Sequence, residues 1–189
     1  MTKATCLKFL FFLSLITNAQ SRFVSNLRQY DPSEGISENR CVIYGTFIPR
    51  GGSWSGGANQ FVTIRNVETN FVSRMEVKRM KTTKEGEFCL FIRPGEYEPM
   101  DYTWTTTYAY VMITHTQPIM RKDSLNDSTL TSSKIFRFSV PPSSLVYVGR
   151  WQFKDEPVSF TDEKDEADKK FIRNYGHLDF LNAKRSVPE

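Results

Sequence analysis

The chain has 189 residues, a formal charge of +4 and 39% hydrophobic residues, including 15 Phe and 8 Tyr. This length suggests one domain, and the aromatic content is sufficient to fill a hydrophobic core without a structural metal. Without Lys3 and Lys8, which lie in an expected signal segment, the formal charge falls from +4 to about +2. Acidic and basic residues are interspersed, so no nucleic-acid-binding surface is expected.

The first part of the chain predicts export. Residues 1–19 combine two lysines with an apolar run at residues 9–16 and end on the small residue Ala19. The run is far shorter than the roughly 20 apolar residues that span a bilayer, so a cleaved signal peptide is favoured over a membrane anchor. The segment resembles signal peptides of Bacteroidetes-type bacteria, and Cys6 precedes the apolar run, unlike a lipoprotein cysteine. We expect a secreted or periplasmic protein with no membrane span in its mature chain.

Composition divides the remaining chain into three parts. Residues 20–40 are polar and lack a sustained periodicity, which predicts an N-terminal leader that either lies across the domain or stays mobile. Residues 41–160 contain short runs of β-branched and aromatic residues bounded by turn residues, which predicts a β-sandwich domain. Residues 161–189 predict a helical C-terminal tail.

About eight strands are expected in an antiparallel β-sandwich. In chain order they are residues 41–48, 60–67, 71–80, 87–92, a return from Tyr97, and residues 104–114, 134–140 and 145–153. Pro94-Gly95 predicts a turn in which glycine supplies a positive φ. Residues 116–133 are polar and are expected to form the longest irregular connection.

The helix prediction rests on charge and periodicity after residue 161. Asp162 is a plausible N-cap, acidic residues follow it, basic residues come later, and Gly176 suits the C′ position. Ala167, Phe171 and Tyr175 recur every four residues and predict a narrow apolar stripe. Compensation of the helix dipole explains the acidic cluster better than a calcium site does, because the glycine of an EF-hand loop is absent.

Residues 86–97 carry a family resemblance. Their sequence, GEFCLFIRPGEY, resembles the G-x-F-x-L-x-x-x-P-G-x-Y signature of transthyretin-like, carboxypeptidase-regulatory-like β-sandwiches. Residues 44–46 and 61–66 fit the first strands of that family, and residues 136–153 are similar to bacterial secreted domains of unknown function. The resemblance implies a prealbumin-like antiparallel sandwich that acts as an accessory or binding module. The Gly-rich loop at residues 51–57 and the long connection at 116–133 depart from the family pattern.

Two cysteines, Cys41 and Cys89, remain after signal removal, and each lies within a predicted strand. An exported protein reaches an oxidising compartment, so the pair could be joined in a disulfide. The alternative is two buried free thiols that act as small hydrophobic residues. The sequence leaves both open, because it does not show whether the two Cα atoms lie within reach.

No catalytic, cofactor-binding or metal-binding residue is predicted. The two histidines, His115 and His177, lie in no spaced metal motif. The Gly52–Gly56 segment has no helix after it, which a serine nucleophile elbow or a phosphate loop would need. A small secreted hydrolase would require His115 to lie within hydrogen-bond reach of a Ser or Asp in a cleft.

Aromatic residues are the most suggestive functional signal. Trp54 lies in the Gly/Ser loop with no apolar neighbours and is the candidate contact residue. Tyr102, Trp104, Tyr108 and Tyr110 alternate along the chain and either line the core or form an exposed row.

The leading hypothesis is an exported, non-catalytic binding or interaction module of the bacterial envelope, which presents loops 51–57 and 116–133 to an envelope protein. The alternatives are a carbohydrate-binding module that stacks sugar rings on Trp54 and an aromatic row, and a small secreted hydrolase.

Overall fold

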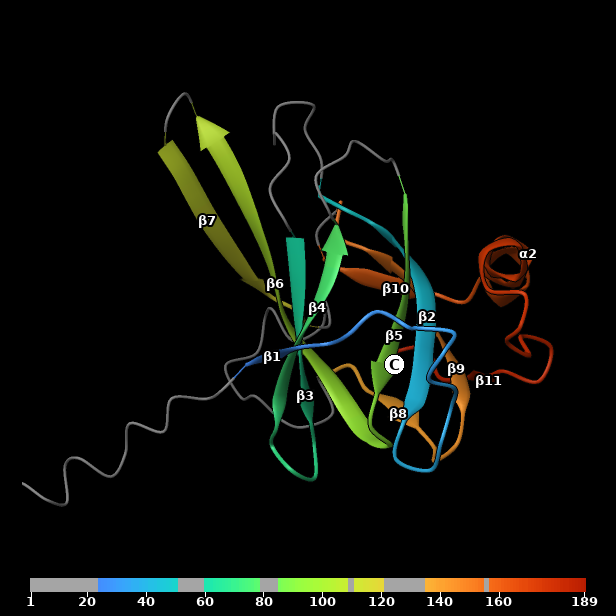
Figure 1. Ribbon diagram of the computed structural model, residues 1–189. Helices are drawn as coiled ribbons and strands as arrows, with labels where there is room; N and C mark the ends of the chain where they lie inside the picture. The colour runs from blue at the N-terminus through green and yellow to red at the C-terminus, as the bar shows by residue number, and fades with distance from the viewer. Residues whose placement is uncertain (1–23, 51–59, 79–84, 109–110, 121–134, 155–156) are drawn as a thin grey trace, which may run out of the picture.

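The computed structural model describes residues 24–50, 60–78, 85–108, 111–120, 135–154 and 157–189. These residues form two β-sheets and one short α-helix (Figure 1), so the prediction of a mainly β protein with a C-terminal helix is confirmed. Within these ranges, no helix is long and apolar enough to cross a membrane.

The first sheet has the strand order β1-β4-β3-β6-β7, and β8 also pairs with β6. Its strands are β1 (Ser25–Asn26), β3 (Gln60–Asn66), β4 (Val72–Lys78), β6 (Gly95–Tyr108), β7 (Val111–Pro118) and β8 (Phe138–Val140). The second sheet has the order β10-β9-β2-β5, with β11 paired to β9. Its strands are β2 (Cys41–Ile48), β5 (Gly86–Ile92), β9 (Leu145–Gln152), β10 (Ser159–Thr161) and β11 (Lys184–Arg185).

Both sheets are mixed, so the prediction of a purely antiparallel sandwich is wrong. Strand β1 runs parallel to β4, and β2 and β11 both run parallel to β9. Parallel neighbours need a long crossover connection. Between β2 and β9 the chain passes through most of the first sheet and returns, which provides that crossover.

Two hydrophobic cores lie on the two faces of the second sheet. Along β2, Ile43 and Phe47 belong to the core shared with the first sheet, whereas Val42 and Tyr44 belong to the core on the opposite face. Alternate residues of a strand point to opposite faces, so a strand buried on both faces has almost no polar positions. This explains why β2 is a nearly continuous apolar run.

The helix α2 (Lys164–Asn174) covers the outer face of the second sheet. Its buried residues include Ala167 and Phe171, as the predicted stripe requires. The N-cap is Glu163 and not the predicted Asp162, although the Asp162 carboxylate accepts a hydrogen bond from the Lys164 backbone N–H at 3.1 Å. The chain after α2 does not stay helical, because β11 returns to the second sheet.

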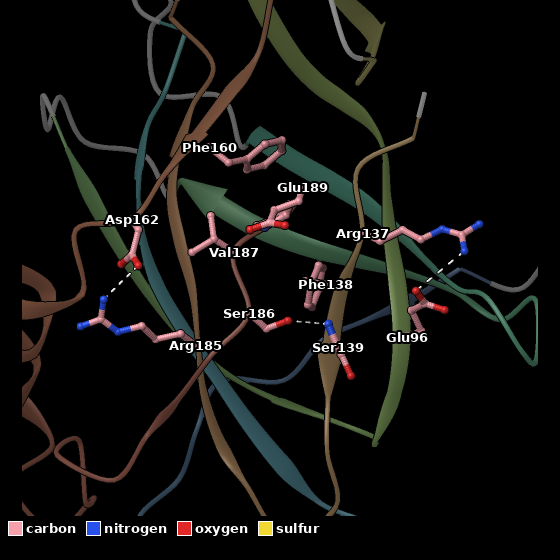
Figure 2. Close-up of a pocket in the computed structure, with 11 residues that line it drawn as sticks. Glu96, Arg137, Phe138, Ser139, Phe160, Asp162, Arg185, Ser186, Val187 and Glu189 are labelled. Atoms are coloured by element: carbon pink, nitrogen blue, oxygen red, sulfur yellow. Dashed lines mark hydrogen bonds and ion pairs between the residues drawn. The ribbon is translucent and has the colours of Figure 1, made fainter. Parts of the chain in front are cut away.

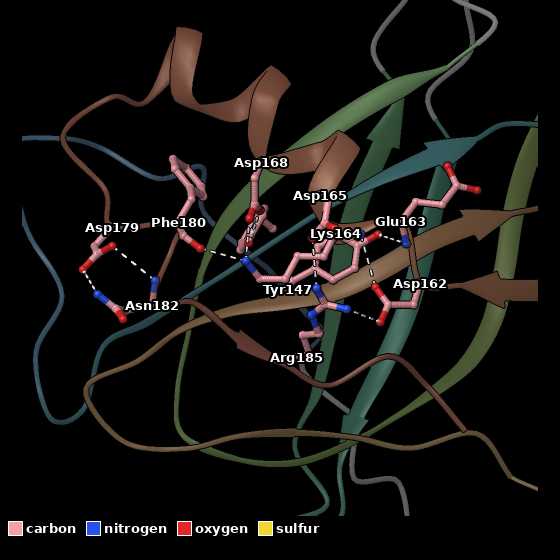
Figure 3. Close-up of polar contacts among 11 residues, drawn as sticks. Tyr147, Asp162, Glu163, Lys164, Asp165, Asp168, Asp179, Phe180, Asn182 and Arg185 are labelled. Atoms are coloured by element: carbon pink, nitrogen blue, oxygen red, sulfur yellow. Dashed lines mark hydrogen bonds and ion pairs between the residues drawn. The ribbon is translucent and has the colours of Figure 1, made fainter.

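Buried polar contacts attach α2 to the second sheet (Figure 3). Lys164 is only 6% exposed, and its Nζ donates to Asp168 Oδ2 at 2.5 Å and to the Phe180 carbonyl oxygen at 2.7 Å. Tyr44 Oη donates to the other oxygen of Asp168 at 2.6 Å. Burial of the Tyr44 ring, followed in importance by this hydrogen bond to Asp168, raises the pKa of Tyr44. Each of these polar groups has a partner, as burial demands.

The described part of the leader lies across the domain, which is the first of the two predicted alternatives. Strand β1 pairs with β4 of the first sheet, and four residues after its end the Tyr30 N–H donates to the Cys89 carbonyl oxygen of the second sheet at 2.8 Å. Tyr30 is buried in the core beneath α2. The leader therefore connects the edges of both sheets.

One predicted strand, residues 104–114, is wrong, because it spans two strands. Strands β6 and β7 pair antiparallel from Asp101 opposite Pro118 to Tyr108 opposite Val111. The sequence here is Tyr108-Ala109-Tyr110, which has none of the Gly, Pro, Asn or Asp residues that mark a turn. Strand β7 also takes residues 116–118 from the predicted irregular connection, and β8 begins only at residue 138.

Candidate functional site

The predicted contact residue, Trp54, and the loop at residues 51–57 lie outside the described residues. Most of the other predicted contact loop, from residue 121 to 133, also lies outside them. The predicted aromatic row is described in part, on β6. Its environment provides the first candidate surface.

The described part of the aromatic row begins in the core with Tyr102 and continues to the half-buried Trp104. Tyr102 is fully buried and stacks on Phe153 with ring centroids 4.2 Å apart. The ring centroid of Trp104 lies 5.4 Å from that of Tyr102. On its other side Trp104 stacks on His115 of β7, with ring centroids 5.1 Å apart and ring planes 15° apart. Tyr102 is thus a core residue, and Trp104 is half-buried. The side chain of Tyr108 and the whole of Tyr110 are outside the description.

Polar groups hold the exposed end of this stack in place. The Arg50 guanidinium lies over the Trp104 ring at 4.7 Å, and its Nη1 donates to Gln117 Oε1 at 2.7 Å. The Arg50 backbone N–H donates to Tyr102 Oη at 3.0 Å, and burial raises the pKa of that phenol. The Trp104 ring is thus contacted by Arg50, Tyr102 and His115.

His115 does not have the neighbour that the hydrolase hypothesis requires. Its Nε2 lies 2.9 Å from Thr106 Oγ1, and no Ser or Asp side chain contacts it among the residues that the structure describes. Within the same residues, no group of three or more His, Cys, Asp or Glu side chains is arranged to hold a metal ion. The second histidine, His177, stacks on Tyr30, and its Nε2 lies 3.0 Å from the tyrosine hydroxyl.

Strand β7 is the last strand of the first sheet in the part of the chain that the structure describes, and its first three residues are apolar and exposed. Val111 is 60% exposed, Met112 69% and Ile113 42%. Successive strand residues point to opposite faces, so neither face of this end is covered. Figure 1 shows the cause, since β6 and β7 reach away from the second sheet toward their hairpin end.

The edge of β7 has little of the usual protection. Natural edge strands are shielded by charged residues, proline, bulges, short length or a covering segment. Strand β7 has eight residues, no Lys, Arg, Asp or Glu, and a single proline at its last position, Pro118, and its pairing with β6 shows no register shift. On its other side, no strand in the described part of the chain pairs with it. Within the described residues, its outer backbone groups therefore have no strand partner and lie beside exposed apolar side chains.

A pocket between the two sheets is a weaker candidate for a binding site than the β7 edge (Figure 2). It has a volume of about 560 Å³ and is lined in part by the C-terminal residues, of which Glu189 exchanges two backbone hydrogen bonds with Arg137. Arg137 pairs with Glu96 at 3.8 Å, and Arg185 pairs with Asp162 at 3.0 Å. The charged side chains thus neutralise each other within the protein, and the pocket has no unpaired arginine to attract a ligand.

Searches of protein-family models, curated proteins and solved structures found no match to this chain. The case for any function therefore rests on the surfaces themselves. Sequence reasoning missed the β7 edge, although the absence of charge between residues 111 and 118 was a signal that could have found it.

Proposed function

We propose that the chain is an exported, non-catalytic interaction module of the bacterial envelope, which binds a protein partner along the free edge of β7. One observation carries the proposal: an uncharged, eight-residue edge strand begins with three exposed apolar residues. Export rests on the signal-like residues 1–19, and the accessory role is in keeping with the transthyretin-like resemblance of residues 86–97 and a prealbumin-like sandwich.

The binding mode follows from the chemistry of a strand edge. An extended segment of the partner would align beside β7 and form main-chain hydrogen bonds with it, as in other cases of strand addition. Residues on alternate faces would supply specificity, with Met112 on one face and Val111 and Ile113 on the other. Burying one such side chain contributes about 1.5–3 kcal/mol, so three of them supply a large part of a useful affinity.

The test compares two lysine substitutions at exposed apolar residues. The protein without residues 1–19 is used to capture partners from a native cell-envelope extract, and the captured protein is then purified and titrated. Met112→Lys places a charge on the edge and should weaken binding at least about tenfold, as the loss of one buried apolar side chain does. Leu181→Lys is the matched control, because Leu181 is 87% exposed and lies after α2.

Equal affinity for the Met112→Lys and Leu181→Lys proteins would refute the proposal. Retained binding after both Val111→Lys and Met112→Lys would do so as well. Circular dichroism of each variant controls for folding. None of the three substitutions should disturb the fold, because the side chains of Val111, Met112 and Leu181 are largely exposed.

A further inference from the structure

A second surface, separate from the β7 edge, is a groove of about 930 Å³ where the leader passes the end of β5. Three arginines line it, Arg28, Arg40 and Arg93, and no carboxylate does. Such a one-sided set of charges in a concave site points to an anionic ligand.

Two of the arginines are held in place before any ligand arrives. The Arg28 and Arg40 guanidiniums lie over the Phe91 ring, at 5.0 and 5.6 Å from its centroid. Both also pair with Glu34, Arg28 Nη2 to Oε2 at 2.6 Å and Arg40 Nη1 to Oε2 at 2.9 Å. These bonds to the arginines lower the pKa of Glu34, the hydrogen bond to Arg28 most of all, so Glu34 stays ionised. The Asp31 carboxylate also lies close enough to Arg28 to contribute to its raised pKa, so Glu34 and Asp31 together offset much of the charge of this pair.

The third arginine, Arg93, is exposed and has no ion pair with any carboxylate in the described part of the chain. It follows β5 directly, in the turn before β6. With Glu34 and Asp31 against three guanidiniums, one positive charge remains in excess at the groove. A guanidinium binds a carboxylate with two parallel hydrogen bonds, which makes arginine the preferred residue for such groups.

The groove also presents an aromatic ring. The Phe71 side chain is 50% exposed, although its backbone is well held: the Phe71 carbonyl oxygen accepts from the Asn66 N–H at 2.9 Å. Exposed amide side chains of Asn26 and Asn39 lie on the same lining. The Phe71 ring can stack on a sugar, and the two amides can hydrogen-bond to its hydroxyl groups. The groove therefore offers sugar contacts beside the charge of its arginines.

The edges of β4 and β5 at this groove are already occupied by the leader. Strand β1 pairs with the edge of β4, and the Leu27 N–H donates to the Arg74 carbonyl oxygen at 2.8 Å. On the β5 side, the Phe91 N–H donates to the Arg28 carbonyl oxygen at 2.9 Å. A peptide added as a strand would find these backbone groups taken. Pairing with β4 or β5 is thus closed to a ligand, and recognition through side chains favours a saccharide over an extended acidic peptide.

We infer that this groove binds an acidic saccharide, a chain of uronic acid units whose carboxylates pair with Arg93 and the Arg28–Arg40 pair while a sugar ring stacks on Phe71. The inference goes beyond the proposed protein interaction and does not depend on it, because the two surfaces share no residue.

The experiment is a calorimetric titration of the protein without residues 1–19. The ligands are tetrasaccharides of galacturonic acid and of mannuronic acid, a neutral galactose tetrasaccharide and a peptide of four glutamates. At least one uronic acid tetrasaccharide should bind, more weakly at higher salt because the contacts are ionic. Arg93→Gln should weaken binding about tenfold, the effect of one charge-assisted hydrogen bond. Phe71→Ala should weaken it to a similar extent.

The matched control is Arg173→Gln, since Arg173 is an exposed arginine of α2 outside the groove lining. Its affinity should equal that of the unmodified protein. The inference is overturned if neither uronic acid tetrasaccharide binds, if Arg93→Gln and Arg173→Gln bind equally well, or if the glutamate peptide binds as tightly as the saccharides. Met112→Lys should bind the saccharide normally, which separates this result from the β7 proposal.

Discussion

Cys41 and Cys89 lie on neighbouring antiparallel strands, yet their side chains occupy opposite faces of the sheet. Cys41 is opposite Ile92 and Cys89 is opposite Tyr44, so the two are three residues out of register. Cys41 belongs to the core between the sheets and Cys89 to the core under α2. An offset of three residues is roughly 10 Å along a strand, well beyond the roughly 7 Å limit for a disulfide. Of the two alternatives left open by the sequence, the structure has the buried free thiols.

The first prediction is therefore a thiol count. The protein without residues 1–19 should show no rapid reaction with a thiol reagent when native, because both cysteines are buried. Unfolding it in denaturant without reductant should expose two reactive thiols. A count of zero after unfolding would mean that the cysteines are bridged and that the strand register is wrong.

The second prediction concerns alkaline pH. Burial raises the pKa of the Cys89 thiol to about 12 from 9.0, and burial raises that of Tyr147 to about 12 from 10.0. The folded protein holds these protons more tightly than the unfolded chain does. The free energy of unfolding should thus be unaffected by these groups below pH 9 and should fall as pH rises from 9 to 12.

Urea unfolding at successive pH values measures this decline. In Cys89→Ala the contribution of this thiol is missing, so the decline between pH 9 and pH 10 should be smaller than in the original protein. An identical pH dependence in both proteins would contradict the assignment to Cys89.

The third prediction concerns the close approach of β2 and β9. Their pairing shifts register between Tyr44 and Thr46, and a Cβ on Gly45 would lie 2.4 Å from the Gly149 carbonyl oxygen and 2.8 Å from the Phe88 ring. Gly45→Ala should therefore lower the free energy of unfolding by about 2–3 kcal/mol, as overpacking does.

Gly35→Ala is the control for Gly45→Ala, because it adds the same methyl group where there is space for it. Its Cβ would meet nothing within 4 Å, but its φ of +61° should still cost roughly 1–2 kcal/mol. If Gly45→Ala is no more destabilising than Gly35→Ala in urea unfolding, steric contact between the two strands does not explain the glycine.

The fourth prediction tests the attachment of α2. Lys164→Met leaves the Asp168 carboxylate without its cation and the Phe180 carbonyl oxygen without its donor. Removing one partner of a buried ion pair costs about 3–5 kcal/mol. Urea unfolding of Lys164→Met should show a loss of this order, whereas Lys169→Met, at an exposed position of the same helix, should unfold like the original protein. Comparable small losses in both would show that the buried network contributes little.

Local signals predicted most elements of the fold. Residues 41–48 match β2, and the apolar stripe after residue 161 matches α2. Gly95 has the predicted positive φ, at +144°. These features depend on neighbours within a few residues, such as the alternation of a strand, the 3.6-residue period of a helix and the freedom of glycine in a turn. The end of β6 and the start of β7 were missed because the sequence of residues 108–110 carries no local turn signal.

The tertiary structure alone decided the strand order, the fate of the cysteines and both candidate surfaces. Parallel pairing of β2 with β9 joins segments about 100 residues apart. No pattern of neighbouring residues indicates which distant strand a strand will pair with. The groove needs the leader, Phe71 and Arg93 in one place, and exposure of Val111 depends on where the second sheet ends. Trp54 lies outside the described residues, and its contact role stays a prediction. Side-chain periodicity shows which face a residue shares with its neighbours, but only packing decides whether that face meets another sheet, a helix or solvent.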